Sequence, residues 1–237
     1  AGAKPDPAML YFRGLAEYKL KKSQEAVASF NAAIKANPKD ATSLYYLGRI
    51  AYEKSDLAGA ITALNRATTA DPRFAPAWAL LTTAYLRRAA TLSGAEADAD
   101  YLSAVRAGEN LSRLRPDAES GALYAQALIA AKQFARAATV LEPLAASDTK
   151  GVTLYLLGVS YSRVKNFPKA IAALERAATK TPNDVNVYTE LGYAYEVSKQ
   201  YPKALAAYQK ASELAPNDAD LKQAVSRVSQ ATAPAGQ

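Results

Sequence analysis

Apolar residues recur at three- and four-residue spacing along most of the chain, which is the pattern of helices that bury one face. The helical windows come in pairs, and most pairs end in a short polar stretch that contains proline. Thr-Pro-Asn-Asp at 181–184 and Ala-Pro-Asn-Asp at 215–218 are 34 residues apart, and Leu157-Gly158 and Leu191-Gly192 repeat at the same spacing. The sequence therefore predicts a series of helical hairpins with a period of about 34 residues.

This period divides the chain into six units between a short extension and a last helix. Residues 1–6 are the N-terminal extension, 219–230 are predicted to cap the last unit, and 231–237 are predicted to be a loose tail. The six units are 7–40, 41–74, 75–117 (which carries an insertion), 118–150, 151–184 and 185–218.

Small and large residues alternate in register within the units. The eighth positions are small: Gly14, Gly48, Thr82, Ala125, Gly158 and Gly192. The twentieth positions are all alanine: Ala26, Ala60, Ala104, Ala137, Ala170 and Ala204. The twenty-fourth positions are mostly bulky: Phe30, Leu64, Gly108, Leu141, Leu174 and Tyr208. Small residues let the two helices of a hairpin cross closely, and the bulky residues fill the remaining gap.

Proline recurs at the thirty-second position, where it ends the second helix: Pro38, Pro72, Pro116, Pro182 and Pro216. With these columns in register, residues 7–218 resemble the tetratricopeptide repeat family. The resemblance implies an all-α fold: a right-handed α-solenoid of six helical hairpins plus a C-terminal capping helix.

Three units depart from the pattern. The third carries about ten extra residues that include Glu96, Asp98 and Asp100, and they either lengthen both helices or form a protruding, solvated acidic loop. The fourth has Pro143 inside its second helix, where we expect a kink. The first has Arg13 and Glu17 where the family usually places Leu and Tyr, so we expect a polar outer face at this end.

The resemblance also implies which side chains face a partner. In the family the first helices line a concave groove, and positions two, five, nine, twelve and thirteen point into it. Among the residues at these positions, we predict that the tyrosines and arginines bind the partner: Tyr11, Tyr18, Tyr45, Arg49, Tyr52, Arg87, Tyr155, Arg163 and Tyr193. Alternatively, many of these tyrosines pack between repeats and leave only the hydroxyl in water.

One specialised binding mode is not expected. Family members that grip the C-termini of Hsp70 and Hsp90 chaperones use Lys and Asn, Asn, then Lys and Arg as a carboxylate clamp. Counted from the first unit, the same positions hold Tyr11, Leu15, Tyr46, Pro76 and Leu80.

The chain has no Cys and no His, which excludes thiol catalysis, Ser-His-Asp triads, disulfides and cysteine or histidine metal sites. No glycine-rich phosphate loop occurs. We therefore predict that the protein is not an enzyme and needs no cofactor or metal.

The net charge is +7, but the basic residues are scattered, with no run longer than two, so nucleic acid is not the expected partner. No apolar stretch approaches the ~20 residues of a membrane span. The expected partner is a protein or peptide, and the expected function is a scaffold, adaptor or assembly factor. The alternative is a binding module for a non-protein polymer such as a glycan or nucleic acid.

The chain begins at Ala1-Gly2-Ala3 without an initiator Met, which fits either a mature exported protein or a chain trimmed at its start. The export-like start and the Ala-rich, cysteine-free composition favour a bacterial envelope factor. By analogy, its role would be in pilus or secretin assembly in the periplasm. A cytoplasmic protein is the alternative.

Overall fold

The computed structural model describes residues 6–232, and within that range the chain forms helices and turns without any strand. The helices of the first part are α1 (Pro7–Lys19), α2 (Ser23–Ala36), α3 (Ala41–Glu53), α4 (Leu57–Ala70), α5 (Ala75–Ala89) and α6 (Gly94–Leu114). Those of the second part are α7 (Ala118–Ala130), α8 (Phe134–Leu141), the 3₁₀ helix η1 (Glu142–Leu144), α9 (Val152–Arg163), α10 (Phe167–Lys180), α11 (Val185–Val197), α12 (Tyr201–Leu214) and α13 (Ala219–Thr232). The predicted all-α repeat fold is confirmed.

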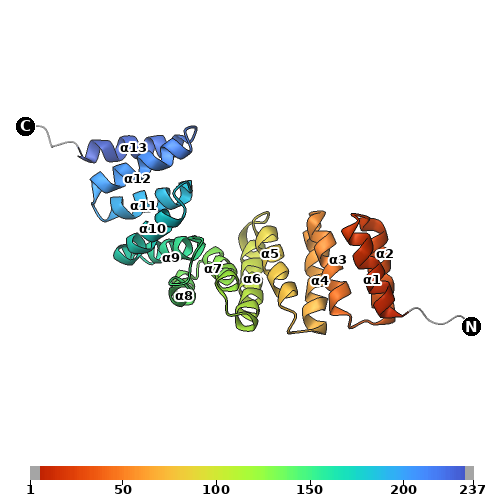
Figure 1. Ribbon diagram of the computed structural model, residues 1–237. Coiled ribbons are helices and arrows are strands. Elements are labelled where there is room, and N and C mark those ends of the chain that lie inside the picture. Colours follow the sequence, from red (N-terminus) through yellow and green to blue (C-terminus); the bar gives the residue numbers. More distant parts are fainter. Residues whose placement is uncertain (1–5, 233–237) are drawn as a thin grey trace, which may run out of the picture. The chain divides into compact units, whose positions relative to one another are not determined.

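The chain forms two compact units, which meet in sequence between Pro116 and Asp117 (Figure 1). The first unit contains α1–α6 and the second contains α7–α13. Inside each unit a helix packs against the next one in the chain, and alternate helices also touch: α3 contacts α5, and α9 contacts both α7 and α11. The first helices of successive hairpins therefore lie side by side, so each unit presents a face built from first helices.

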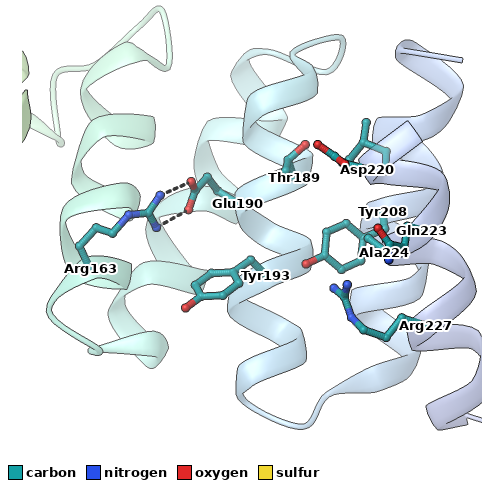
Figure 2. A pocket seen from close by; sticks show the side chains of 10 residues that line it. Arg163, Thr189, Glu190, Tyr193, Tyr208, Asp220, Gln223, Ala224 and Arg227 are labelled. Carbon is teal, nitrogen blue, oxygen red and sulfur yellow. Dashed lines mark hydrogen bonds and ion pairs between the residues drawn. The ribbon is translucent and has the colours of Figure 1, made fainter. Parts of the chain in front are cut away.

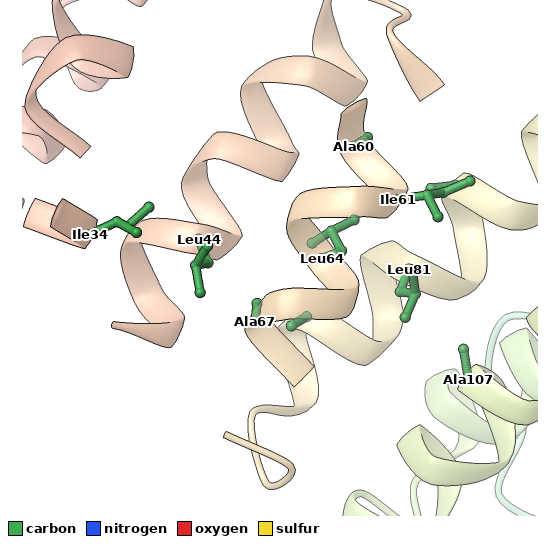
Figure 3. Close-up of a cluster of buried hydrophobic side chains, with 10 residues drawn as sticks. Ile34, Leu44, Ala60, Ile61, Leu64, Ala67, Leu81 and Ala107 are labelled. Atoms are coloured by element: carbon green, nitrogen blue, oxygen red, sulfur yellow. The ribbon is translucent and has the colours of Figure 1, made fainter. Parts of the chain in front are cut away.

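The alternation of small and large residues sets the spacing inside each hairpin. All six alanines of the twentieth position are fully buried. In the second hairpin Leu64 of α4 is also fully buried, and it lies directly over Gly48 of α3. Figure 3 shows Leu64 in a cluster that continues from Ile34 and Leu44 to Leu81. The core is thus a row of small clusters, each made within a hairpin and shared with its neighbour.

Acidic and amide side chains begin several helices, because their oxygens accept hydrogen bonds from the free backbone N–H groups of the first turn. Asp40 accepts from the backbone N–H of Ser43 at 3.1 Å, and Asp218 accepts from that of Leu221 at 3.1 Å. Asp184 accepts from the N–H of Asn186 at 2.9 Å. In these three turns, the Asp that follows the proline therefore fixes where the next helix starts.

The insertion in the third hairpin is not an acidic loop. It extends α6, which begins at Gly94 and is 21 residues long, whereas α5 has 15. Asp100 is 5 % exposed, and both of its carboxylate oxygens accept hydrogen bonds from Arg88 at 2.6 Å. Of the two alternatives, the lengthened helices are confirmed and the solvated loop is wrong, because this ion pair and the buried Ala97 fix the extra turns of α6 against α5.

Two further expectations need correction. Pro143 does not kink a continuous helix: α8 ends at Leu141, and Pro143 lies in η1, where its missing N–H costs no α-helical hydrogen bond. The outer face of the first hairpin is mixed rather than mainly polar: Arg13 is exposed, but Met9, Phe12 and Leu20 are among the most exposed large apolar side chains of the described residues.

The predicted N-terminal extension and tail fall mostly at 1–5 and 233–237, outside the described residues.

Candidate functional site

All nine predicted binding residues lie on first helices, six in the first unit and three in the second. They do not form one site in either unit, because some of them, such as Tyr11 and Tyr45, pack against other side chains of the same chain.

The first unit carries a polar cluster between α1 and α3. The Tyr18 hydroxyl donates a hydrogen bond of 2.5 Å to Glu53, and the Arg49 Nε donates one of 3.1 Å to the same carboxylate oxygen. The Arg49 guanidinium lies 5.4 Å from the centre of the Tyr18 ring, within cation–π range. Burial and the hydrogen bond to Glu53 raise the pKa of Tyr18 to about 12, so its hydroxyl stays protonated at neutral pH.

The same arrangement recurs one hairpin later, between α3 and α5. Arg87 places its guanidinium 5.1 Å from the centre of the Tyr52 ring and donates a hydrogen bond of 3.1 Å to the Ser55 hydroxyl. In both cases an arginine lies over a tyrosine of the preceding first helix. The four residues Tyr18, Arg49, Tyr52 and Arg87, with Glu53, make up what we call the α1–α5 face.

Two other predicted residues of this unit are packing residues. Tyr11 makes ring contacts with Phe12, Phe30 and Tyr46, with centroids 5.2–6.2 Å apart, and burial raises its pKa. Tyr45 meets Phe74 edge-on at 5.3 Å. The alternative in which tyrosines pack between repeats therefore describes Tyr11 and Tyr45 better than a binding role does.

The second unit has a concave site, which we call the α11–α13 depression (Figure 2). It has a volume of about 580 Å³ and is lined by Arg163, Thr189, Glu190, Tyr193, Tyr208, Asp220, Leu221, Gln223, Ala224 and Arg227. Tyr193 is 43 % exposed, which leaves much of its ring open to a ligand. Of the predicted residues, the structure brings Arg163 and Tyr193 into this site.

Ion pairs hold the charged side chains of the depression in fixed positions. Arg163 donates two hydrogen bonds to the carboxylate of Glu190, at 2.7 and 3.1 Å, and Figure 2 shows this fork between α9 and α11. Arg227 of α13 likewise donates two hydrogen bonds to Glu196, at 2.8 and 2.9 Å. Two-pronged pairs of this kind orient both partners, so the guanidinium edges left over have defined directions.

The second of these ion pairs extends to a buried phenol. The Tyr208 hydroxyl donates a hydrogen bond of 3.0 Å to Glu196. The hydrogen bonds from Arg227 and Tyr208 lower the pKa of Glu196, whereas burial and the bond to Glu196 raise the pKa of Tyr208. At neutral pH, Glu196 is therefore a carboxylate and Tyr208 a neutral donor.

Tyr155, the third predicted residue of this unit, does not line the depression. It is half-buried on α9, and burial together with the charges of Glu190 and Asp184 raises its pKa.

The prediction missed the contribution of α13, which was expected only to cap the last hairpin. Asp220, Gln223 and Arg227 line the depression from this helix. Counted from 219 with the same period, they occupy positions two, five and nine of a seventh unit. Thr189 and Tyr193 are positions five and nine of the sixth. The repeat period therefore predicts these three positions when it is continued by one unit beyond residue 218.

A second hollow of the same unit, of about 430 Å³, lies between α7, α9 and the turn before α9. Its lining includes Ala122, Leu123 and Val152, with Gln126 and Glu119 at its polar side. The buried Asp148 is part of the lining and accepts hydrogen bonds from the backbone N–H groups of Gly151 and Leu154, at 2.8 and 2.9 Å. Since these bonds fix the start of α9, the role of Asp148 is structural.

These surfaces carry side chains that donate and accept hydrogen bonds. Tyrosine rings, guanidinium groups and amides are arranged at the surface, and no group of three or more metal-ligating side chains occurs within residues 6–232. Over the same residues, no helix has the length and apolar character needed to span a membrane.

The model of the tetratricopeptide repeat matches residues 3–38, 11–73 and 155–219, which together make up more than half of the chain. A second model, that of subunit 3 of the anaphase-promoting complex (cyclosome), matches residues 98–177. No curated protein sequence matches the chain significantly.

Solved structures with the same fold include YrrB, described as a tetratricopeptide protein with an unusual peptide-binding site. It is 18 % identical, with 84 % of this chain and 97 % of YrrB covered and a TM-score of 0.64. MamA from Desulfovibrio magneticus RS-1 is 20 % identical over 76 % of this chain and 97 % of its own, with a TM-score of 0.64. The C-terminal part of a repeat protein from Cytophaga hutchinsonii is 15 % identical over 93 % and 88 %, with a TM-score of 0.67. At these identities the likeness concerns the fold alone.

Proposed function

The chain belongs to the tetratricopeptide repeat family, which supports protein–protein interaction in general, and from this premise we propose that it binds a peptide or helix of a partner protein on its first-helix faces. The observation that carries the proposal is the α11–α13 depression. It combines an exposed aromatic ring, Tyr193, with side chains that donate and accept hydrogen bonds.

The lining of the depression suits a peptide. Thr189 and Gln223 each carry both donors and acceptors, which is what the alternating N–H and C=O groups of an extended backbone require. Tyr193 offers a large rigid contact at low entropic cost, as interface anchors commonly do. The ordered guanidinium groups of Arg163 and Arg227 add directed donors at opposite sides.

The alternative ligand, an acidic polymer such as nucleic acid or an anionic glycan, is less well supported. Each arginine of the depression is paired with a glutamate, and Asp220 adds a further carboxylate. On the α1–α5 face Arg49 is likewise paired with Glu53. An acidic polymer requires net positive potential along its path, and these pairs cancel it locally.

The proposed partner-binding residues are accordingly Tyr18, Arg49, Tyr52 and Arg87 in the first unit, and Tyr193, Arg163, Gln223 and Arg227 in the second. A role in pilus or secretin assembly in the bacterial periplasm stays a prediction, which fractionation of the source cells would test.

The proposal is tested by capture from an extract of the source cells on immobilised protein. The variant Tyr193→Ala/Gln223→Ala removes two groups of the depression, and both side chains project from the surface, so the fold is expected to persist. The matched control, Leu102→Ala/Gln209→Ala, shortens an exposed large side chain and a glutamine on the second helices α6 and α12. We expect the first variant to lose the captured protein and the control to retain it. Equal retention by both would remove the depression as the binding site.

A further inference from the structure

The outer face of α1 carries apolar side chains in water. Met9 is 70 % exposed, Phe12 64 % and Leu20, directly after the helix, 68 %. Ala16 is exposed as well. These four residues lie at spacings of three and four, so they form one stripe, which we call the α1 stripe. In Figure 1, α1 and α2 lie at the N-terminal end of the first unit.

The repeat itself shows what such a stripe is for. Met9, Phe12 and Ala16 are the third, sixth and tenth positions of their unit. The same positions of the next unit are Ser43, Tyr46 and Ile50. Tyr46 and Ile50 pack against the first hairpin, and Ser43 is buried.

Those contacts are close. The Tyr46 ring stacks on Phe30 with centroids 5.3 Å apart and planes 7° from parallel, and Ile50 is 3 % exposed. The α1 stripe is thus a stacking face of the same kind, and within the described residues no hairpin covers it.

The other end of the repeats does not supply a cover. On α13 the third, sixth and tenth positions are Leu221, Ala224 and Val228, and all three are buried. The residues on the outside of α13 include Lys222, Ser226 and Ser229, which are exposed and polar. A second copy could therefore not bury the α1 stripe against its own α13, and a head-to-tail filament is not favoured.

The α1 stripe is complementary to itself. We propose that it is covered by the α1 stripe of a second copy of this chain, with the two α1 helices antiparallel about a twofold axis. In that register Phe12 of one copy faces the small Ala16 of the other, and Met9 faces Leu20. Large side chains then meet small ones near the axis and flexible ones meet at the two ends, which is how packed helix pairs avoid gaps.

Charge favours the same orientation. Asp6 precedes α1, and Lys19, Lys21 and Lys22 lie at its other end, all exposed. Antiparallel pairing brings Asp6 of one copy near Lys22 of the other, twice by symmetry. Parallel pairing would instead place the lysines of both copies together. This dimer uses no residue of the α1–α5 face or of the α11–α13 depression, so it is independent of the proposed binding function.

The first test is sedimentation velocity over a wide concentration range. One helix pair buries less than the roughly 1,600 Å² of a standard interface, so we expect a micromolar dimer and would measure to about 100 µM. Phe12→Asp should weaken the dimer at least tenfold. Leu102→Asp, which puts the same charge on an exposed leucine of α6, should leave it unchanged. Circular dichroism must show equal helix content for both variants.

The second test fixes the register. The 237-residue chain has no cysteine, so Met9→Cys/Leu20→Cys introduces two thiols that are the only ones in it. Within one chain they are 11 residues apart, about 16 Å along a helix, too far for a disulfide. Antiparallel pairing places the thiol at position 9 of one copy opposite the thiol at position 20 of the other. Mild oxidation should therefore give a covalent dimer of the double variant, and either single variant should cross-link far less.

Three results would overturn the proposal. They are a monomeric wild type throughout the concentration range, a dimer that Phe12→Asp leaves intact, and cross-linking by Met9→Cys alone as fast as by the double variant. The last would indicate parallel pairing.

Discussion

Helices α3 and α4 approach closely at Gly48, and the distances there predict how a substitution of this glycine changes the free energy of unfolding. A Cβ atom placed on Gly48 would lie 2.7 Å from Leu64 Cγ, 3.0 Å from its Cδ2 and 3.2 Å from the carbonyl oxygen of Ala60. Ordinary carbon–carbon contacts are about 3.5–4.0 Å. Because Leu64 is fully buried, it cannot swing into solvent to make room. The change Gly48→Ala therefore forces the two helices apart or pushes Leu64 off its rotamer.

Two opposing effects set the size of the change. Overpacking a core costs about 1–3 kcal/mol, whereas replacing glycine by alanine inside a helix gains about 1 kcal/mol. We expect a net loss of about 1 kcal/mol for Gly48→Ala. Gly121→Ala in α7 is the matched control, because the added Cβ meets only the end of the Leu144 side chain, which lies in η1 and can move. There the helix gain should dominate, and the variant should be neutral or slightly more stable.

The assay is urea unfolding followed by circular dichroism, with hydrogen exchange of α3 and α4, since repeat proteins can unfold in parts. Leu64→Ala alone should cost about 2–5 kcal/mol. The double variant Gly48→Ala/Leu64→Ala should lose at least about 1 kcal/mol less unfolding free energy than the two single losses added together. The reason is that the cavity left by the Leu64 side chain accepts the new methyl group. Strictly additive effects, or a stabilising Gly48→Ala, would refute the argument that this glycine sets the helix spacing.

Three further predictions concern buried or paired polar groups. Asp100→Asn should lower the free energy of unfolding by about 1–3 kcal/mol, because it breaks the two-pronged pair with Arg88, and urea denaturation would measure this. The Ser162 hydroxyl is buried without a hydrogen-bond partner in residues 6–232, so Ser162→Ala should raise stability by up to about 1 kcal/mol, and a lower urea midpoint would contradict this. The folded-state pKa of Glu196 is lowered by Arg227, so its contribution to stability is complete above the unfolded value of about 4.3 and is lost as the pH falls through the lower folded value. Thermal melts at pH 7 and pH 3 should therefore differ less for Arg227→Met than for wild type, and equal differences would show that the pair does not stabilise the docking of α13.

Much of the fold could be predicted from the sequence, because the columns that set it are residue-size constraints repeated at one period. The alanines at the twentieth position and the bulky residues at the twenty-fourth are buried where the pattern requires. The third unit departs from both columns in a compensating way: it has Thr82 at the eighth position, where the other units have Gly or Ala, and Gly108 at the twenty-fourth, where they have a bulky residue. The small and bulky residues that fit together lie within one repeat unit, so their complementarity is visible in the sequence alone.

Other features depend on contacts that the pattern does not contain. The turns inside five hairpins place Lys21, Ser55, Lys132, Lys165 and Lys199 in the left-handed region, with φ between 58° and 63°. Glycine is the residue usually found in this conformation, so Lys and Ser at these positions do not predict it. The helical path of the insertion also follows from one specific partner, Arg88, 12 residues away from Asp100.

The candidate site was predicted in part. Repeat positions correctly placed the nine residues on first helices, but they did not show that Tyr11 and Tyr45 are used in packing. Nor could they show that Arg163 and Glu190 pair across α9 and α11, since a pair of charges 27 residues apart has no local signature. The residues of α13 are a different case: no second helix follows α13 within residues 6–232, so its sequence alone does not form a complete repeat unit.

The most direct test of partner binding by the first-helix faces is site-specific photo-cross-linking in extract of the source cells. Benzoylphenylalanine would replace Tyr193 in the α11–α13 depression and, in a separate chain, the exposed Leu102 of α6. Our account predicts that position 193 cross-links to a discrete protein, identified by mass spectrometry, and that position 102 does not. Cross-linking of that protein at position 102 with none at 193, or at 193 to nucleic acid or glycan alone, would contradict it.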